Sequence, residues 1–192
     1  MQRTIGMAAS ILLVSCLMAA SAHAEDQHLY GTFSLGAAIP EVDIASPEPG
    51  ASGDFGLALG IQTSDAFRWD IAEVHYMNIA GTDLGFGTTR SNVTLGTTLN
   101  WGLFDPDTQF NPFVSLGLGA ARLRYQEAGT AILDDDWAFD WNVGGGVSYN
   151  ASDRARTSLR YRYRQTNRDV GGQDFSVDIH SISVEFSFGG GS

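Results

Sequence analysis

The chain has 192 residues, of which 22 are acidic and 11 are basic, and every basic residue is an arginine. The net charge of −11 excludes the basic surface by which a domain of this size binds nucleic acid. A single cysteine, Cys16, excludes an internal disulfide and a metal site built from several thiolates. The length fits one domain with a sizeable core, for which we expect neither a cofactor nor a metal site.

Residues 1–24 have the features of a secretory signal peptide. Arg3 supplies the positive start, an apolar stretch follows, and Ala22-His23-Ala24 has the small-x-small form that signal peptidase cleaves. The mature chain would then begin at Glu25. Two alternatives stay open. The apolar stretch could anchor the chain, although it is shorter than the ~20 residues of a spanning helix, and a lipobox-like sequence could lead to acylation of Cys16.

After this segment, apolar and polar residues alternate in eight stretches, a period that predicts β-strands with two different faces. No stretch contains about 20 consecutive apolar residues, so we expect no membrane-spanning helix. The expected strands are, in chain order, roughly 27–39, 53–63, 67–80, 90–103, 111–126, 136–150, 155–166 and 175–188. The third is the least regular of the eight.

The two faces of these strands differ in size as well as in polarity. In the second stretch, the bulky face carries Phe55, Leu57, Leu59 and Ile61, and the small face carries Asp54, Gly56, Ala58 and Gly60. A membrane barrel turns its bulky apolar face to lipid and its small polar face inward. Its sheet must close, because open edges would leave unpaired backbone groups in hydrocarbon. We therefore predict an all-β, eight-stranded, antiparallel up-and-down transmembrane β-barrel; the alternative is a soluble lipocalin-like barrel.

The connections between the expected strands alternate in length. The shorter ones cover residues 63–66, 104–110 and 150–153, and the longer or more polar ones cover 40–52, 81–89, 127–135 and 167–174. Short turns face the periplasm and longer loops face the exterior in transmembrane barrels, so both termini are expected in the periplasm. The chain would then consist of a signal peptide (1–24), a barrel (25–188) and a Gly-rich tail (189–192).

Several charged residues are expected to point into this barrel. They are Glu73, His75, Asp140, Arg160, Arg162 and Glu185. A charge in a crowded interior has to be paired, and we expect Arg160 and Glu185 in one ion-pair network. Eight strands leave an interior just wide enough for side chains, so the network is expected to plug the lumen. The alternative is a gate whose charges could re-pair and open a pore.

Aromatic residues concentrate near the expected strand ends, and tryptophan and tyrosine prefer membrane–water interfaces. The residues expected there are Trp69, Tyr76, Trp101, Trp137, Trp141, Tyr149 and Phe188. Four arginines near the expected outer ends could contact lipopolysaccharide phosphates. They are Arg122, Arg124, Arg164 and Arg168. Arg164 also belongs to a run with Arg154, Arg156, Arg160 and Arg162, which could indicate anion or nucleic-acid binding. The alternation of this run with Leu159, Tyr161 and Tyr163 favours an inward-facing ladder.

On these residues the chain resembles the eight-stranded outer-membrane barrels of the OmpA-transmembrane, OmpX and opacity-protein type. The likeness lies in FNPFVSLGLGAARLRY (110–125), WNVGGGVSYNASDRARTSLRYRYR (141–164) and ISVEFSF (182–188), and it covers about residues 27–188. It implies the bacterial outer membrane, with lipid and lipopolysaccharide around the barrel. The last strand is similar to the signal that the barrel-assembly machinery reads. Members normally end on its final aromatic residue, here Phe188, whereas this chain continues for four residues.

This resemblance implies a scaffold more than an activity. We expect a non-enzymatic integral outer-membrane protein that stabilises the envelope or presents loops to an unknown surface ligand. One alternative is a narrow channel for ions or small solutes. Another is a lipid A-modifying barrel enzyme, which would need a histidine, a serine and an orienting acid on the lipid-facing side. His180 and Ser181 are adjacent in a strand and should point to opposite faces, so they form no such pair.

Overall fold

The computed structural model describes residues 28–42, 50–64, 66–80, 89–104, 108–126, 137–152, 154–170 and 173–189. The expected signal peptide, Cys16 and the last three residues lie outside these ranges. No helix within the described ranges is long and apolar enough to cross a membrane.

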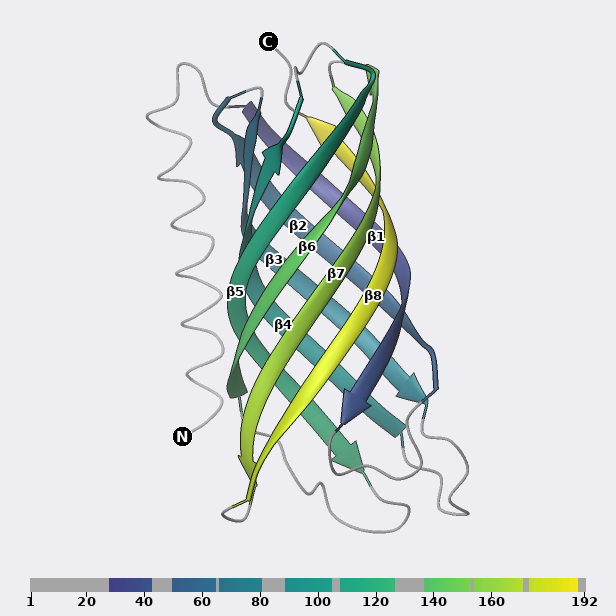
Figure 1. Ribbon diagram of the computed structural model, residues 1–192, viewed down its shortest axis with the longest axis vertical. Helices are drawn as coiled ribbons and strands as arrows, with labels where there is room; N and C mark the ends of the chain where they lie inside the picture. Colours follow the sequence, from purple (N-terminus) through teal and green to yellow (C-terminus); the bar gives the residue numbers. More distant parts are fainter. Residues whose placement is uncertain are drawn as a thin grey trace.

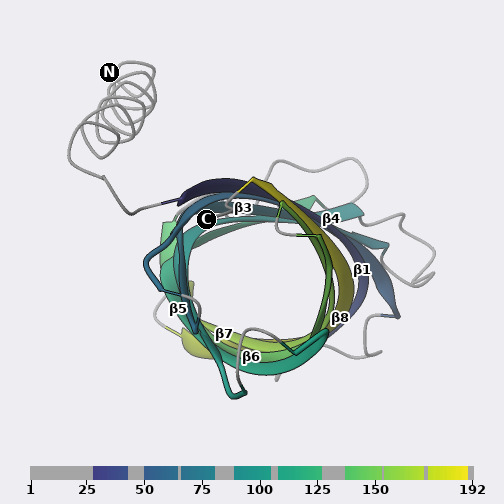
Figure 2. The ribbon, with the colours of Figure 1, turned by 90° about the horizontal axis from the view of Figure 1, so that it is seen from above.

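Eight strands form one closed antiparallel barrel, in which each strand pairs with its neighbours in the chain and the last pairs with the first (Figure 1). Seen along its axis, the barrel is a single ring of strands (Figure 2). The strands are β1 His28–Val42, β2 Ser52–Gln62, β3 Phe67–Ala80, β4 Thr89–Gly102, β5 Phe110–Gln126, β6 Trp137–Ser152, β7 Ala155–Val170 and β8 Gln173–Gly189. The predicted eight-stranded all-β barrel is confirmed.

One end of the barrel holds the connections β2–β3, β4–β5 and β6–β7, together with the start of β1 and the end of β8 (upper end in Figure 1). Backbone hydrogen bonds join these segments: the Gly102 amide donates to the Ala66 carbonyl at 2.8 Å, and the Gly189 amide donates to the Arg154 carbonyl at 3.0 Å. We call this end the turn end and the opposite end the loop end.

A bulge in β3 explains why its alternation is irregular. The pairing of β3 with β4 shifts between Asp70 and Glu73, and its pairing with β2 shifts at the same level. The one extra residue places the side chains of both Asp70 and Glu73 in the interior, where they are 5 % and 6 % exposed. Without a bulge, two residues three positions apart would point to opposite faces.

The structure corrects the predicted loop at 167–174. β7 and β8 stay paired as far as Val170 and Gln173, so only Gly171 and Gly172 separate the two strands. Two-residue connections are the commonest in β-hairpins, and they favour glycine because their backbone angles are left-handed. The Gly–Gly pair was the sequence signal for this hairpin, and the polar residues on either side of it obscured the strands.

The first strand also runs beyond its predicted end at residue 39. Beyond Ala38, β1 pairs with β8 but no longer with β2, so one of its edges is free of ladder partners among the described residues. Proline is tolerated at such an edge because it has no amide hydrogen to donate. Pro40 therefore lies within β1, which continues to Val42.

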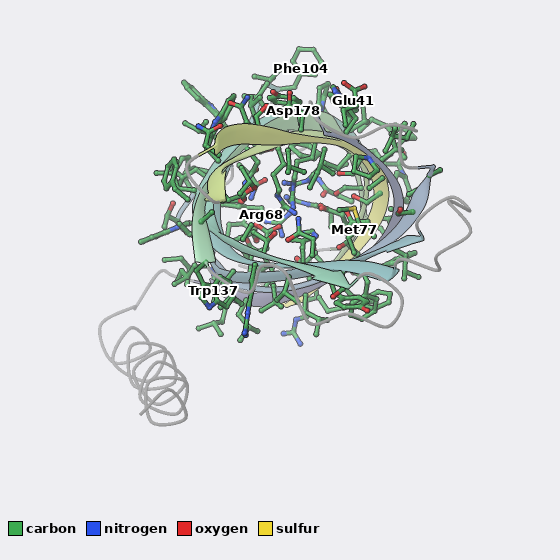
Figure 3. The ribbon with its side chains drawn as sticks, turned by 90° about the horizontal axis from the view of Figure 1, so that it is seen from below. Glu41, Arg68, Met77, Phe104, Trp137 and Asp178 are labelled. Carbon is green, nitrogen blue, oxygen red and sulfur yellow. The ribbon has the colours of Figure 1, made fainter. Side chains whose placement is uncertain are left out.

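The barrel is apolar outside and polar inside. On β5, the outward side chains of Val114, Leu116 and Leu118 are 45 %, 56 % and 52 % exposed. The buried residues are mostly serine, threonine, asparagine and charged residues. Figure 3 shows Arg68 inside the ring of strands and Trp137 outside it. An apolar exterior of this extent matches lipid, and the polar interior is wrong for a soluble lipocalin-like barrel.

The predicted interface aromatics all belong to the outward-facing sets of their strands. Toward the turn end lie Trp69, Trp101, Tyr149 and Phe188, and toward the loop end lie Tyr76, Trp137 and Trp141. Ile61 belongs to the same outward set yet is only 7 % exposed, because its register neighbours on the two sides are Leu29 and Trp69. That these rings mark the membrane boundaries stays a prediction.

Replacing Leu116 with arginine is expected to lower the free energy of unfolding by about 2–4 kcal/mol, because the new charge would face lipid near the middle of the apolar band. Urea unfolding of the barrel in phospholipid vesicles measures the change. Ala151→Arg is the control, since it adds the same charge at an exposed position near the turn end. Equal losses in the two variants would contradict a lipid-facing exterior.

Candidate functional site in the barrel lumen

The six charged residues that the sequence pattern placed inside the barrel all lie buried in the lumen. They are Glu73, His75, Asp140, Arg160, Arg162 and Glu185, none more than 6 % exposed. They come from β3, β6, β7 and β8, so their contacts can connect strands that are not neighbours in the sheet.

Glu73 and Arg162 form the central contact of the lumen. Arg162 Nη1 lies 2.6 Å from Glu73 Oε1, and the Thr98 hydroxyl donates to Glu73 Oε2 at 2.6 Å. His75 Nε2 also contacts Glu73 Oε1, while its Nδ1 lies 3.3 Å from Asp54 Oδ1. Both oxygens of Glu73 are therefore occupied, and the ion pair spans the lumen from β3 to β7.

Glu185 lies between two arginines of the neighbouring strand β7. Arg160 Nε is 2.9 Å from Glu185 Oε1, and Arg162 Nη2 is 3.9 Å from the same oxygen. Arg160 also donates from Nη2 to Asn100 Oδ1 at 2.7 Å, and its guanidinium lies 4.9 Å from the centre of the Phe113 ring. Arg160 and Glu185, expected to share a network, are thus in direct contact, and Arg162 links them to Glu73.

Arg164 belongs to the lumen and not to a lipopolysaccharide contact, which corrects one of the two readings of this residue. Its side chain is 6 % exposed, and its Nε lies 3.2 Å from Asp140 Oδ1. Thr166 donates to the other oxygen of Asp140 at 2.9 Å. Arg122 pairs in register with the outward-facing Trp137. The side chains of Arg124 and Arg168 lie outside the described part of the structure.

Four further charged residues line the lumen: Asp54, Arg68, Asp70 and Arg156. Arg156 belongs to the arginine run that was expected to face inward, whereas Arg68 and Asp70 were not predicted. Tyr30 donates to Asp70 Oδ1 and Asn100 donates to Asp70 Oδ2, each at 2.7 Å. Alternation already placed Asp54 on the small face. Asp70 was hidden by the bulge, because its inward orientation breaks the period of two.

The described lumen contains equal numbers of arginines and carboxylates. The arginines are Arg68, Arg156, Arg160, Arg162 and Arg164, and the carboxylates are Asp54, Asp70, Glu73, Asp140 and Glu185. Balanced charge allows a dry interior to remain close to neutral, which limits the free energy required to bury it.

A small apolar cluster lies in the lumen toward the loop end. It consists of Ala38, Met77, Val177 and Ile179, which are 0–4 % exposed. Figure 3 shows Met77 inside the ring of strands. This cluster was not predicted, although Val177 and Ile179 continue the inward phase of the serines in β8. Polar residues share this level of the lumen, because Asp54 and Asn92 are the register neighbours of Met77, and Thr166 and Arg164 are those of Val177 and Ile179.

The residues considered for catalysis do not form a nucleophile–base pair. His180 faces outward, with its Nδ1 2.7 Å from the Tyr161 hydroxyl and its ring 5.2 Å from the ring of Tyr163. Ser181 lies in the lumen and is 6 % exposed, as strand geometry predicts. Within the described ranges, no group of three or more histidine, cysteine, aspartate and glutamate side chains could hold a metal ion.

Replacing Glu73 with glutamine is expected to lower the free energy of unfolding by about 3–5 kcal/mol, because Arg162 would lose its closest counter-charge. Denaturant titration of the refolded barrel measures the loss. Glu41→Gln removes a carboxylate from the exposed exterior and should change stability by less than about 0.5 kcal/mol. Similar values for both variants would show that the central ion pair does not hold the lumen together.

Comparison with known proteins places this barrel in a family. Residues 8–188 match the family model described as outer membrane protein beta-barrel domain. No curated protein sequence matches the chain.

Solved structures agree on the fold. Neisserial surface protein A is 15 % identical with a TM-score of 0.62, over 84 % of this chain and 96 % of that protein. Ail, the attachment invasion locus protein of Yersinia pestis, is 10 % identical with a TM-score of 0.50, over 83 % and 99 %. OprG from Pseudomonas aeruginosa is 13 % identical with a TM-score of 0.50, over 86 % and 96 %. The chain belongs to the outer-membrane β-barrel family and is a protein of the bacterial outer membrane.

Proposed function

We propose that this protein is a non-enzymatic outer-membrane barrel with a closed lumen, which strengthens the envelope and presents its loop end to surface ligands. The observation that carries this proposal is the chain of contacts Glu73–Arg162–Glu185–Arg160, which crosses the lumen between β3, β7 and β8. A chain of this kind fills the cross-section of the barrel with bonded side chains.

A conducting path would have to break several of these contacts together. Removing one partner of a buried ion pair costs about 3–5 kcal/mol, so opening two pairs at once would be rare at equilibrium. Toward the loop end, the path would then meet the bulky side chains of Met77, Val177 and Ile179 beside the ion pair of Arg164 with Asp140. An eight-stranded barrel is only wide enough for its own side chains, which favours a plug over the alternative channel.

The proposal includes an orientation of the barrel in the outer membrane. Short connections face the periplasm in this architecture, so the turn end and both termini are assigned to the periplasm. At the loop end, Glu41 and Asp178 are register partners on the outside of β1 and β8 (Figure 3). Two carboxylates at this level suit the headgroup region, where lipopolysaccharide and water begin. During biogenesis, the barrel-assembly machinery would read the end of β8.

The surroundings of the outward-facing His180 support a non-enzymatic role. The described partners of His180 are tyrosines, and neither Tyr161 nor Tyr163 can serve as the acid that orients a catalytic imidazole. The adjacent serine lies on the other face of the strand.

In planar lipid bilayers, the wild-type barrel is expected to show no stable unitary conductance, because the lumen is filled. The preparation is first shown to be folded by its heat-modifiable migration in detergent gels. A Met77→Ala, Arg162→Ala double variant removes side chains from the apolar cluster and from the ion pairs and should raise the frequency of current steps. Stable, uniform single channels from the wild type would establish the channel and overturn the plugged lumen.

Lipid A from cells that overproduce the protein is expected to have the same mass spectrum as lipid A from cells without it. A loss or gain of one acyl chain that disappears in a His180→Ala variant would establish the enzyme instead.

A further inference from the structure

We propose that the turn end of the lumen contains a binding site for a small phosphate-type oxyanion, formed by Arg68, Arg156 and Arg160. This site is separate from the ion pairs that close the middle of the barrel, and it adds a ligand to the plugged barrel proposed above.

A small cavity lies at this end of the lumen, with a volume of about 20 Å³. The three arginines line it together with the polar side chains of Asn100, Ser148 and Ser158. The cavity also touches Ala66, in the β2–β3 connection, and Gly102, the last residue of β4, and both lie at the turn end. Arg68 and Arg156 are only half-buried, so solutes can reach them from that side.

Two of these arginines have no carboxylate partner within the described residues. Arg68 donates from Nη2 to the Ser187 hydroxyl at 3.1 Å and lies 4.0 Å from the centre of the Tyr30 ring. Arg156 donates from Nε to Asn150 Oδ1 at 2.7 Å. Deeper in the lumen, Arg162 and Arg164 each contact a carboxylate. Asp70 is the carboxylate near these arginines, and its described partners are Tyr30 and Asn100. Arg68 and Arg156 therefore form no direct ion pair among the described residues.

Arg160 supplies the innermost part of the site. Its side chain is 4 % exposed, and its Nη1 has no hydrogen-bond partner among the described residues. Its Nε faces Glu185 and its Nη2 donates to Asn100, so protein partners hold the Arg160 guanidinium in place. The side chain forms the inner wall of the cavity and adds its positive charge to that of Arg68 and Arg156.

The chemistry of the three side chains points to a tetrahedral oxyanion. Guanidinium groups bind phosphate through paired, charge-assisted hydrogen bonds, and partial burial strengthens the attraction. A cavity of about 20 Å³ has room for about one water molecule, so a phosphate group would lie at the mouth between Arg68 and Arg156 with one oxygen in the cavity. The ligand is therefore inorganic phosphate or the terminal phosphate of a larger molecule that stays outside the mouth. Binding itself does not depend on the proposed orientation of the barrel, but the periplasmic origin of the ligand rests on it.

Isothermal titration of the full barrel with inorganic phosphate tests the site. The protein is held in a non-ionic detergent without phosphate groups, at low ionic strength, with sodium chloride titrated as the reference anion. Saturable binding of one phosphate per barrel is expected, and Arg156→Gln and Arg68→Gln should each weaken it about tenfold. Heat-modifiable migration shows that each variant has folded.

Arg154→Gln is the matched control, because Arg154 is exposed at the same end, carries the same charge and does not line the cavity. Its affinity for phosphate should stay within about twofold of the wild type. Absence of saturable phosphate binding by the wild type would overturn the site. Equal weakening in Arg154→Gln and Arg156→Gln would overturn it as well, because the attraction would then be unspecific.

A second arm distinguishes a soluble phosphate from a lipid headgroup. The titration is repeated in nanodiscs of phosphatidylcholine, with and without phosphatidylglycerol. Phosphate binding that persists at the same affinity supports a soluble ligand, and binding that falls as phosphatidylglycerol increases supports a headgroup in the same arginine site.

Discussion

The ion pair between Arg162 and Glu73 is the contact on which the organisation of the lumen depends, because it joins opposite walls of a narrow barrel. A side chain as long as arginine fits there only where the facing residues are small. At Gly117, an added Cβ atom would collide with the side chains of Asn142 and Thr98, and at Gly56 it would collide with Ser34 and His75. The small inward-facing residues thus leave the space that the charged side chains require.

The same charges also fix the register of the strands. Buried ion pairs add little net stability relative to apolar residues of similar volume, since both partners lose their hydration. Buried ion pairs have a larger effect on the free energy of alternative strand registers. A slip of one residue in β7 would turn Arg160, Arg162 and Arg164 toward lipid, at about 2–4 kcal/mol for each arginine near the midplane. The arginine ladder therefore favours the observed register of β7 with its neighbours over a register shifted by one residue.

Local periodicity was sufficient to predict which residues face the lumen, and contacts between adjacent strands followed from chain order. Arg160 and Glu185 meet because β7 and β8 form a hairpin. The contact of Arg162 with Glu73 could not be derived in this way, because β3 and β7 are far apart in the sheet and their relative height depends on the stagger of the whole barrel. Asp70 was missed for a local reason, the bulge that breaks the alternation of β3.

The uneven distribution of charge along the lumen is the feature that a plug alone does not explain. A lumen selected only for closure would pair each buried charge or replace it with an apolar residue. Arg162 and Arg164 follow this rule, because each contacts a carboxylate. At the turn end, Arg68 and Arg156 have no carboxylate contact among the described residues. Departures from local consistency concentrate at functional sites, so the arginines of the turn end are where a ligand of this barrel is to be sought.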